Sequence, residues 1–348
     1  MNPYVLIMML SLMILGTLIT LTSSHWLLAW MGLEINTFAI VPIMIQDKHP
    51  RAMEATLKYF IVQSTAAITL LFATASNAWL SGQWEIQYMM HPLFLTISIF
   101  ALTLKLGLAP THSWFPEVLQ GLNFLMGLTL ATWQKFAPFA LLMQISYTSP
   151  LLCTILGLTS ILVAGWGGLN QTQLRKIFAY SSIAHLGWAF LVIQYCAPLA
   201  LMTFFIYTIM AAPIFMSLHH LQTKNMNALL ISWSKYPIMY LILPFSLLSM
   251  AGLPPLTGFL PKWLVLEELT KQSLMCMAIV TSLSMLLNLY YYLLLSYNMA
   301  LITPPGNTPA TLTHYLLNPQ SFFFLTTIMP FSLCLYPILP SLATFFML

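Results

Sequence analysis

Apolar segments of about twenty residues follow one another along almost the whole chain. The hydrocarbon core of a bilayer is about 30 Å thick, so a helix that rises about 1.5 Å per residue needs roughly 20 apolar residues to cross it. Only 5% of the 348 residues are charged, whereas a soluble domain carries about a quarter. A chain with so few charges cannot cover a water-facing surface. The sequence therefore predicts an all-α polytopic membrane protein.

Counting apolar segments predicts about eleven transmembrane helices, near 3–22, 25–45, 57–78, 93–120, 122–145, 149–169, 175–195, 198–220, 237–270, 273–297 and 322–346. We interpret residues 1–348 as one membrane domain with a core over 23–297, followed by a Pro-rich connector and a C-terminal transmembrane helix in 298–348. The first sixteen residues lack the basic region of a signal peptide and the Arg-rich pattern of a transit peptide. They are therefore expected to begin the first span.

Two of these spans, the fourth and the ninth, are interrupted by similar motifs. "GLAPTHSWFP" (107–116) aligns without gaps on "GLPPLTGFLP" (252–261), with a glycine, a leucine and two prolines in common. Because the two spans are five apart, they should cross the membrane in opposite directions. Gly/Pro-broken helices at corresponding positions of two oppositely oriented halves are typical of an inverted-repeat transporter.

Basic residues lie almost entirely on one side of the predicted membrane. If the N-terminus is placed on that side, alternation of the spans puts seven basic residues there and one on the other side: Lys48, Arg51, Lys58, Arg175, Lys176, Lys224 and Lys235 against Lys271. By the positive-inside rule this side is the cytoplasm or the mitochondrial matrix. The N-terminus is then inside and, after eleven spans, the C-terminus outside.

Four ionisable residues lie deep inside predicted spans: Glu34, Lys105, Lys135 and Lys262. A charge at the bilayer centre costs at least about 2.5–3.5 kcal/mol, so such residues need a partner, water or a function. A buried ion pair that fixes helix register is the structural alternative. It would employ Glu34 with one lysine and leave two lysines over.

Prolines beside these charges indicate local hydration. A helical proline cannot donate to the carbonyl four residues earlier. Pro110 would therefore free the carbonyl of Leu106, next to Lys105, and Pro138 that of Gln134, next to Lys135. Prolines 254, 255 and 261 could leave acceptors at residues 250, 251 and 257. Because free carbonyls at membrane depth need water or a polar partner, a hydrated polar seam is expected there.

The residue types in this seam favour protons as cargo. Lysine can bind and release a proton as burial and neighbouring charges change the cost of its charged form. Cationic lysines repel Na⁺, and an acidic sodium cage is not apparent. His185, inside the seventh span, and His112, inside the first break, are possible relay residues. Glu117, beside that break, is a site of proton uptake or an interfacial cap.

Other classes of site are not supported by the sequence. The cysteines, Cys153, Cys196, Cys276 and Cys334, lie far apart in apolar segments, which predicts buried hydrophobic residues rather than disulfides, zinc or iron–sulfur ligands. "GWGGLNQ" (165–171) lacks the strand–turn–helix setting of a nucleotide-binding loop. No haem, flavin or quinone pattern stands out, so we expect no cofactor bound by this chain. A net charge of +4 without a basic stripe argues against a nucleic-acid partner.

Three motifs resemble a known family: "KLGLAPTHSWFPEV" (105–118), "GWGGLNQTQLRKIFAYSSIAHLGW" (165–188) and "GLPPLTGFLPKW" (252–263). The chain is similar to the antiporter-like chain 2 family of respiratory complex I, the proton-translocating NADH:ubiquinone oxidoreductase, in its animal mitochondrial form. The resemblance implies two inverted five-helix repeats, each with a discontinuous helix, in the mitochondrial inner membrane. It implies other membrane-arm and accessory subunits, lipids such as cardiolipin, and protons as partners. NADH, FMN, iron–sulfur clusters and ubiquinone would belong to other subunits.

The resemblance also implies roles for single residues. Glu34 is similar to the family's intramembrane glutamate and Lys105 to its partner on the first discontinuous helix. Lys135 resembles the central-channel lysine, and Lys262 the terminal lysine on the second discontinuous helix. His185 falls where relatives often place a channel histidine. Bacterial relatives have about fourteen spans, and the three that are missing here precede Glu34.

Two other functions remain open at this point. One is a stand-alone cation/proton antiporter, and the other is a scaffold subunit whose buried charges only stabilise it. A proton-conducting subunit driven by redox chemistry elsewhere in complex I is the favoured prediction.

Overall fold

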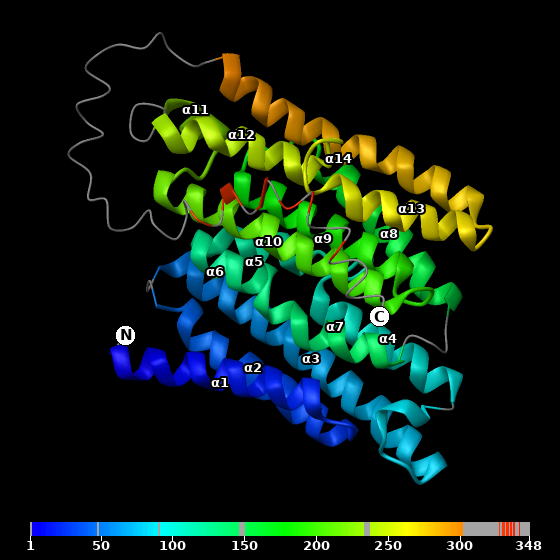
Figure 1. Ribbon diagram of the computed structural model, residues 1–348. Coiled ribbons are helices and arrows are strands. Elements are labelled where there is room, and N and C mark those ends of the chain that lie inside the picture. Colours follow the sequence, from blue (N-terminus) through cyan, green and yellow to red (C-terminus); the bar gives the residue numbers. More distant parts are fainter. Residues whose placement is uncertain are drawn as a thin grey trace. The chain divides into compact units, whose positions relative to one another are not determined.

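The computed structural model describes residues 2–46, 49–89, 91–145, 150–232 and 237–301, and single positions between 327 and 341. Regular structure in these ranges is helical throughout, which confirms the predicted all-α class (Figure 1). The chain divides into two compact units, residues 1–156 and 157–348, with the division inside helix α8 (Pro150–Gly168).

Unit 1 contains the following helices before α8: α1 (Pro3–Thr22), α2 (Trp26–Met44), α3 (Pro50–Ser81), the 3₁₀ turn η1 (Ile86–Tyr88), α4 (Pro92–Leu106), α5 (Trp114–Gly121), α6 (Phe124–Ala131) and α7 (Trp133–Ile145). Here α1 packs on α2, α2 on α3, and α3 on both α4 and α5. Close approach of α1 and α2 depends on two glycines, because a Cβ on Gly16 would lie 2.9 Å from the carbonyl oxygen of Gly32. Small residues at helix contacts are typical of packing in lipid.

Unit 2 continues with α9 (Leu174–Val192), α10 (Ala197–Leu221), α11 (Met226–Ile231), α12 (Pro237–Ala251), α13 (Phe259–Lys271) and α14 (Met275–Leu301). Helix α12 packs on α14 and α10, and α13 packs on α9, α10 and α14. The long α14, orange in Figure 1, continues through 298–301, which the sequence assigned to the connector. The rest of that connector, up to 321, and most of the predicted span 322–346 lie outside the described residues.

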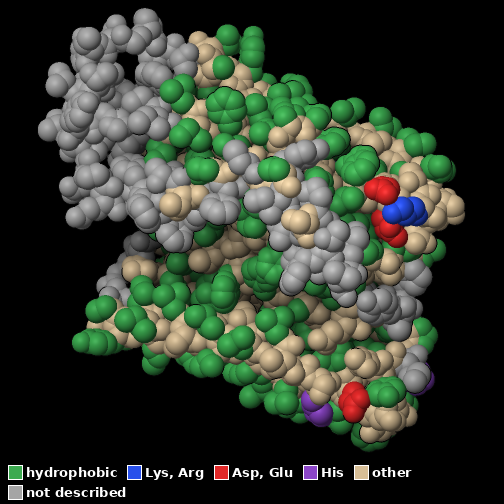
Figure 2. Space-filling model, in the orientation of Figure 1, with side chains coloured by type: hydrophobic (Ala, Val, Ile, Leu, Met, Phe, Trp, Pro, Cys, Tyr) green, Lys and Arg blue, Asp and Glu red, His purple; other side chains and the backbone are tan. Residues whose placement is uncertain are grey.

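Six described helices are long and apolar enough to cross a membrane by length and composition. They are α1, α2, α3, α10, α14 and residues 151–168 of α8. Hydrophobic side chains are also spread over the described surface visible in Figure 2, where few charged groups appear. Among cysteines the prediction of burial is only partly right, because Cys153 is buried but Cys276 is exposed, and Cys334 lies outside the described residues.

Both predicted helix breaks are present and use the same backbone device. Gly107 and Gly252 adopt left-handed conformations, with φ of +74° and +85°, directly after α4 and α12. The amide of Leu108 donates to the oxygen of Thr103 (3.1 Å), and that of Leu253 to the oxygen of Leu248 (3.4 Å). This six-residue cap is the Schellman arrangement, for which glycine is favoured at the left-handed position. The aligned sequence motifs thus encode the same helix end twice.

A further interruption was not predicted. The sequence indicated one span over 122–145, but the helix is divided at Thr132 into α6 and α7. The Thr132 hydroxyl donates to the oxygen of Leu128 (2.7 Å), and the amide of Lys135 donates to the oxygen of Thr132 (3.2 Å). A side chain that bonds the preceding turn competes with regular helix. Lys135 therefore lies in the first turn of α7 and not in the middle of a helix.

Candidate functional site

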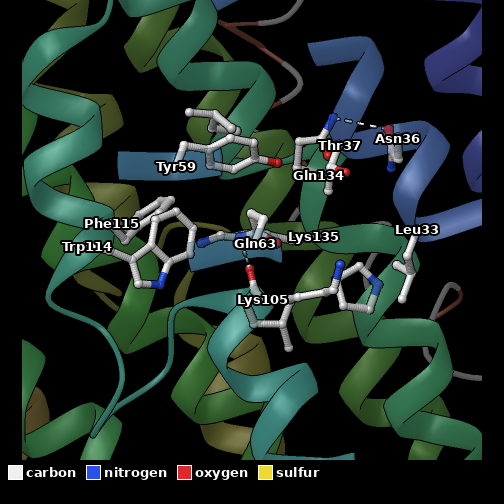
Figure 3. A pocket seen from close by; sticks show the side chains of 13 residues that line it. Leu33, Asn36, Thr37, Tyr59, Gln63, Lys105, Trp114, Phe115, Gln134 and Lys135 are labelled. Carbon is white, nitrogen blue, oxygen red and sulfur yellow. Dashed lines mark hydrogen bonds between the residues drawn. The ribbon is translucent and has the colours of Figure 1, made fainter. Parts of the chain in front are cut away.

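A small cavity with polar and apolar lining lies beside the first break, inside unit 1 (Figure 3). The volume open to the centre of a water molecule is about 20 Å³, and one water needs about 10–15 Å³ of such volume. Its lining is mostly polar or aromatic: Leu33, Asn36, Thr37, Tyr59, Gln63, Lys105, Leu106, Trp114, Phe115, Leu130, Gln134, Lys135 and Pro138. The cavity thus brings together two of the predicted lysines and has room for water.

Lys105 reaches this cavity from the last turn of α4. Its side chain is 5% exposed, and its ammonium nitrogen has no hydrogen-bond partner among the described residues. Its backbone oxygen does have a partner, because the Gln63 side-chain amide donates to it at 3.3 Å. The ammonium is therefore held at the cavity by backbone contacts and not by an ion pair of its own.

Lys135 reaches the same cavity from α7. It is 2% exposed, and its nitrogen lies 4.3 Å from the centroid of the Phe115 ring. A cation over the face of an aromatic ring is attracted by the ring quadrupole, more strongly when both groups are removed from water. Since Phe115 belongs to α5, this contact joins Lys135 to the second half of the broken helix.

Glu34 is connected to the cavity through a threonine. It lies half-buried on α2, and no direct ion pair joins it to Lys105 within the described part of the chain. The Thr37 hydroxyl, which lines the cavity, is 3.3 Å from the Glu34 carboxylate and 2.8 Å from its backbone oxygen. The alternative of a buried ion pair that fixes helix register would need a direct bond between Glu34 and a lysine. The described residues do not contain such a bond between Glu34 and Lys105.

Lys262 occupies a different kind of site, in unit 2. It is 4% exposed and lies on α13, just after the second break. Its ammonium donates to the backbone oxygens of Met250 (3.1 Å) and Ala251 (2.8 Å), two of the acceptors that the prolines were predicted to leave free. Positive charge at a helix C-terminus is favoured by the helix dipole. Lys262 thus caps the end of α12.

The second break also contacts the C-terminal part of the chain. The buried Thr257 hydroxyl donates to the backbone oxygen of Ser332 at 2.6 Å, and Ser332 is itself fully buried. Thr257 is the last residue before Gly258, the N-cap of α13. A residue from the predicted last span therefore anchors the segment between the two half-helices.

The two predicted relay histidines lie in different surroundings. His112 lies half-buried inside the first break, with its Nδ1 atom 3.3 Å from the oxygen of Pro110, and does not line the cavity. His185 lies on α9 in unit 2 and stacks on Tyr207, with ring centroids 5.3 Å apart. The predicted relay role of each stays a prediction.

Sequence reasoning missed most of the residues that complete the cavity. Thr37, Gln63 and Phe115 are examples; they are uncharged, so a search for charges in apolar segments does not find them. Gln63 offered a signal, because an amide in the middle of an apolar span has to find a partner. No group of three potential metal-ligating side chains occurs among the described residues.

Comparison with known proteins identifies the family. Residues 23–288 match the family described as NADH:quinone oxidoreductase/Mrp antiporter, TM. NADH-ubiquinone oxidoreductase chain 2 of Tetraodon nigroviridis is 55% identical over 346 residues, 99% of each chain. The chain belongs to this family. The chain 2 protein of Salmo salar is 53% identical over 345 residues, 99% of each chain, which confirms the resemblance carried by the three motifs.

Chains of three solved complexes have a similar fold. Respiratory complex I from Thermus thermophilus contains a chain with a TM-score of 0.82 and 25% identity, over 97% of this chain and 80% of that one. An archaeal respiratory complex, the membrane-bound sulfane sulfur reductase, matches with a TM-score of 0.84 at 16% identity, over 97% and 74% of the two chains. The Mrp complex of Dietzia matches with a TM-score of 0.72 at 15% identity, over 84% and 60%. The predicted antiporter-like fold of a complex I chain 2 protein is confirmed.

Proposed function

We propose that this chain is a core membrane-arm subunit of respiratory complex I and conducts protons across the mitochondrial inner membrane. Glu34, Lys105, Lys135 and Lys262 would be the groups that carry the proton. The observation that carries this proposal is the cavity in unit 1, where two buried lysines meet around a space large enough for a water molecule.

The contacts around the cavity suggest an order of transfer in unit 1. The Thr37 hydroxyl can accept a proton from one side and donate one to the other, as any hydroxyl can. This hydroxyl lies 3.3 Å from the Glu34 carboxylate, and Thr37 lines the same cavity as both lysines. A proton would pass from Glu34 through Thr37 and water in the cavity to Lys105 and Lys135. Lys262 would accept or release a proton at the second break.

Membership of the family and the distribution of basic residues support a setting for this transfer. NADH oxidation and ubiquinone reduction, with FMN and iron–sulfur clusters, would take place in other subunits, and their energy would reach this chain through the assembly. The chain would span the inner membrane several times, with its N-terminus in the matrix and its C-terminus in the intermembrane space. Other complex I subunits, and lipids such as cardiolipin, would cover the apolar surface.

Glu34 provides the test of this function. Complex I carrying Glu34→Gln is expected to move clearly fewer protons per NADH oxidised in sealed vesicles, because an amide cannot bind and release the proton. Glu85→Gln is the matched control, since Glu85 is an exposed glutamate of the same unit and does not line the cavity. An unchanged ratio for Glu34→Gln would contradict the role given to this residue.

A native gel run beforehand tests the assembly. Co-migration of the chain with NADH dehydrogenase activity supports a complex I subunit. A free small oligomer without that activity would favour the stand-alone antiporter instead.

A further inference from the structure

The end of α4 in unit 1 corresponds to the end of α12 in unit 2, but different groups bind the two helix ends. Under the alignment of the two motifs, Lys105 corresponds to Met250, so their backbone oxygens occupy equivalent places at the ends of two half-helices. In unit 2 the ammonium of Lys262 binds this oxygen at 3.1 Å. In unit 1 the side-chain amide of Gln63 binds it at 3.3 Å. The same free carbonyl is thus satisfied by a cation in one break and by a neutral amide in the other.

This difference matters because a helix end inside the membrane must have its carbonyls satisfied. In the second break a lysine is used for that purpose. In the first break an amide from another helix does so, and the side chain of Lys105 lines the cavity. Gln63 is 4% exposed and lines the cavity itself, together with Lys105 and Lys135.

Gln63 belongs to a face of α3 that holds both sides of the first break. Lys58 pairs with Glu117 of α5 at 2.8 Å, and the ring of Tyr59 lies 5.9 Å from that of Trp114. Nearer the N-terminus of α3, Ala55 contacts the end of α5, because a Cβ on Gly121 of α5 would lie 2.6 Å from the Cβ of Ala55. Helix α5 therefore lies directly against α3. Positions 55, 58, 59 and 63 recur at the spacing of one helix face.

The indole of Trp114 completes the connection across the break. Its Nε1 atom donates to the backbone oxygen of Leu104 at 3.1 Å, next to the carbonyl bound by Gln63. Two consecutive carbonyls of the last turn of α4 are therefore held from outside that helix, one from α3 and one from α5. The backbone of Lys105 cannot shift without breaking these contacts.

We propose that Gln63 is a positioning residue for proton transfer at Lys105: its amide caps α4 and fixes the ammonium of Lys105 at the cavity. This inference rests on the proposed function of Lys105. Gln63 carries no proton itself, and its effect should pass entirely through Lys105.

The test uses Gln63→Leu, which keeps the approximate volume and removes the donor. With the variant assembled in complex I, we expect protons moved per NADH in sealed vesicles to fall, and the rate of coupled turnover to fall between a few-fold and about a hundredfold, as for other misplaced reacting groups. Ser64→Ala is the control on the same helix, because the Ser64 hydroxyl donates only to the oxygen of Ile61 in its own helix. It should leave both values unchanged.

A double variant separates positioning from a general structural role. In a Lys105→Met background, Gln63→Leu should add no further loss, because residues that act through one another are not additive. A further loss of the same size in that background would show that Gln63 acts independently of Lys105 and would overturn the inference. If Gln63→Leu prevents assembly on a native gel, Gln63→Met replaces it, and failure of both would show an architectural role instead.

The two proposals can fail separately. If Lys105→Met lowers the proton ratio and Gln63→Leu does not, the positioning role is wrong and the proposed function stands. If neither variant changes the ratio, the function proposed for Lys105 is wrong, and the role of Gln63 with it.

Discussion

Complex I assembled with Lys105→Met in this chain should move fewer protons per NADH oxidised, although the complex should assemble normally. Lys105 is 5% exposed, and its ammonium has no hydrogen-bond partner among the described residues. Methionine has a similar length and no charge, so the replacement removes a buried cation at little structural cost. Loss of a group that transfers protons typically slows such a step by about 10²–10⁴-fold.

This substitution distinguishes function from architecture. If the lysine only stabilised the fold, its replacement would lower the amount of assembled complex and leave the proton ratio of the remaining complex unchanged. Native gels and proton release into sealed vesicles measure the two quantities separately. Normal assembly with an unchanged ratio and rate would exclude Lys105 from the proton path.

Gly252→Ala is expected to disrupt the second break. Gly252 has φ of +85°, a conformation that costs an L-residue roughly 1–2 kcal/mol. A Cβ there would also lie 3.0 Å from the Lys262 ammonium and 3.2 Å from the oxygen of Gly258. Displacement of the ammonium would weaken its bonds to Met250 and Ala251, and a hydrogen bond to a charged group contributes about 1.5–3 kcal/mol. The variant should therefore be less stable and pump less well.

Gly82 offers a matched control for this experiment. It has φ of +72°, but a Cβ there would have no atom within 4 Å. Gly82→Ala should therefore incur the backbone cost alone. Heating of the purified complex before a native gel measures stability, and the proton ratio measures pumping. Equal effects of the two substitutions would contradict the role given to the contact with Lys262.

Backbone breaks were the features that the sequence predicted best. Gly107 and Gly252 were found because the left-handed helix end requires glycine, and this requirement is local. The acceptors for Lys262 were also predictable, since a proline cannot satisfy a carbonyl of the preceding turn. Charges in apolar segments likewise marked Lys105 and Lys135, because lipid makes them costly wherever the helices pack.

Contacts between helices were not predictable in the same way. The resemblance implied Lys105 as the partner of Glu34, and the contact of Glu34 with Thr37, which lines the cavity, became visible only in the structure. The sequence did not show which group Gln63 binds, or that the helix is divided at Thr132. These features depend on which faces of α2, α3 and α7 meet, and apolar spans carry little pattern to show their faces because both lipid and neighbouring helices are apolar.

The central claim is that Lys105 and Lys135 act in one proton path through one cavity. It is tested most directly by the number of protons moved per NADH in complexes carrying Lys105→Met, Lys135→Met, and both together. A single path predicts that each variant lowers the ratio and that the double variant lowers it no further than the more severe single one. Losses that add up in the double variant, or a ratio unchanged in either single variant, would contradict a shared path.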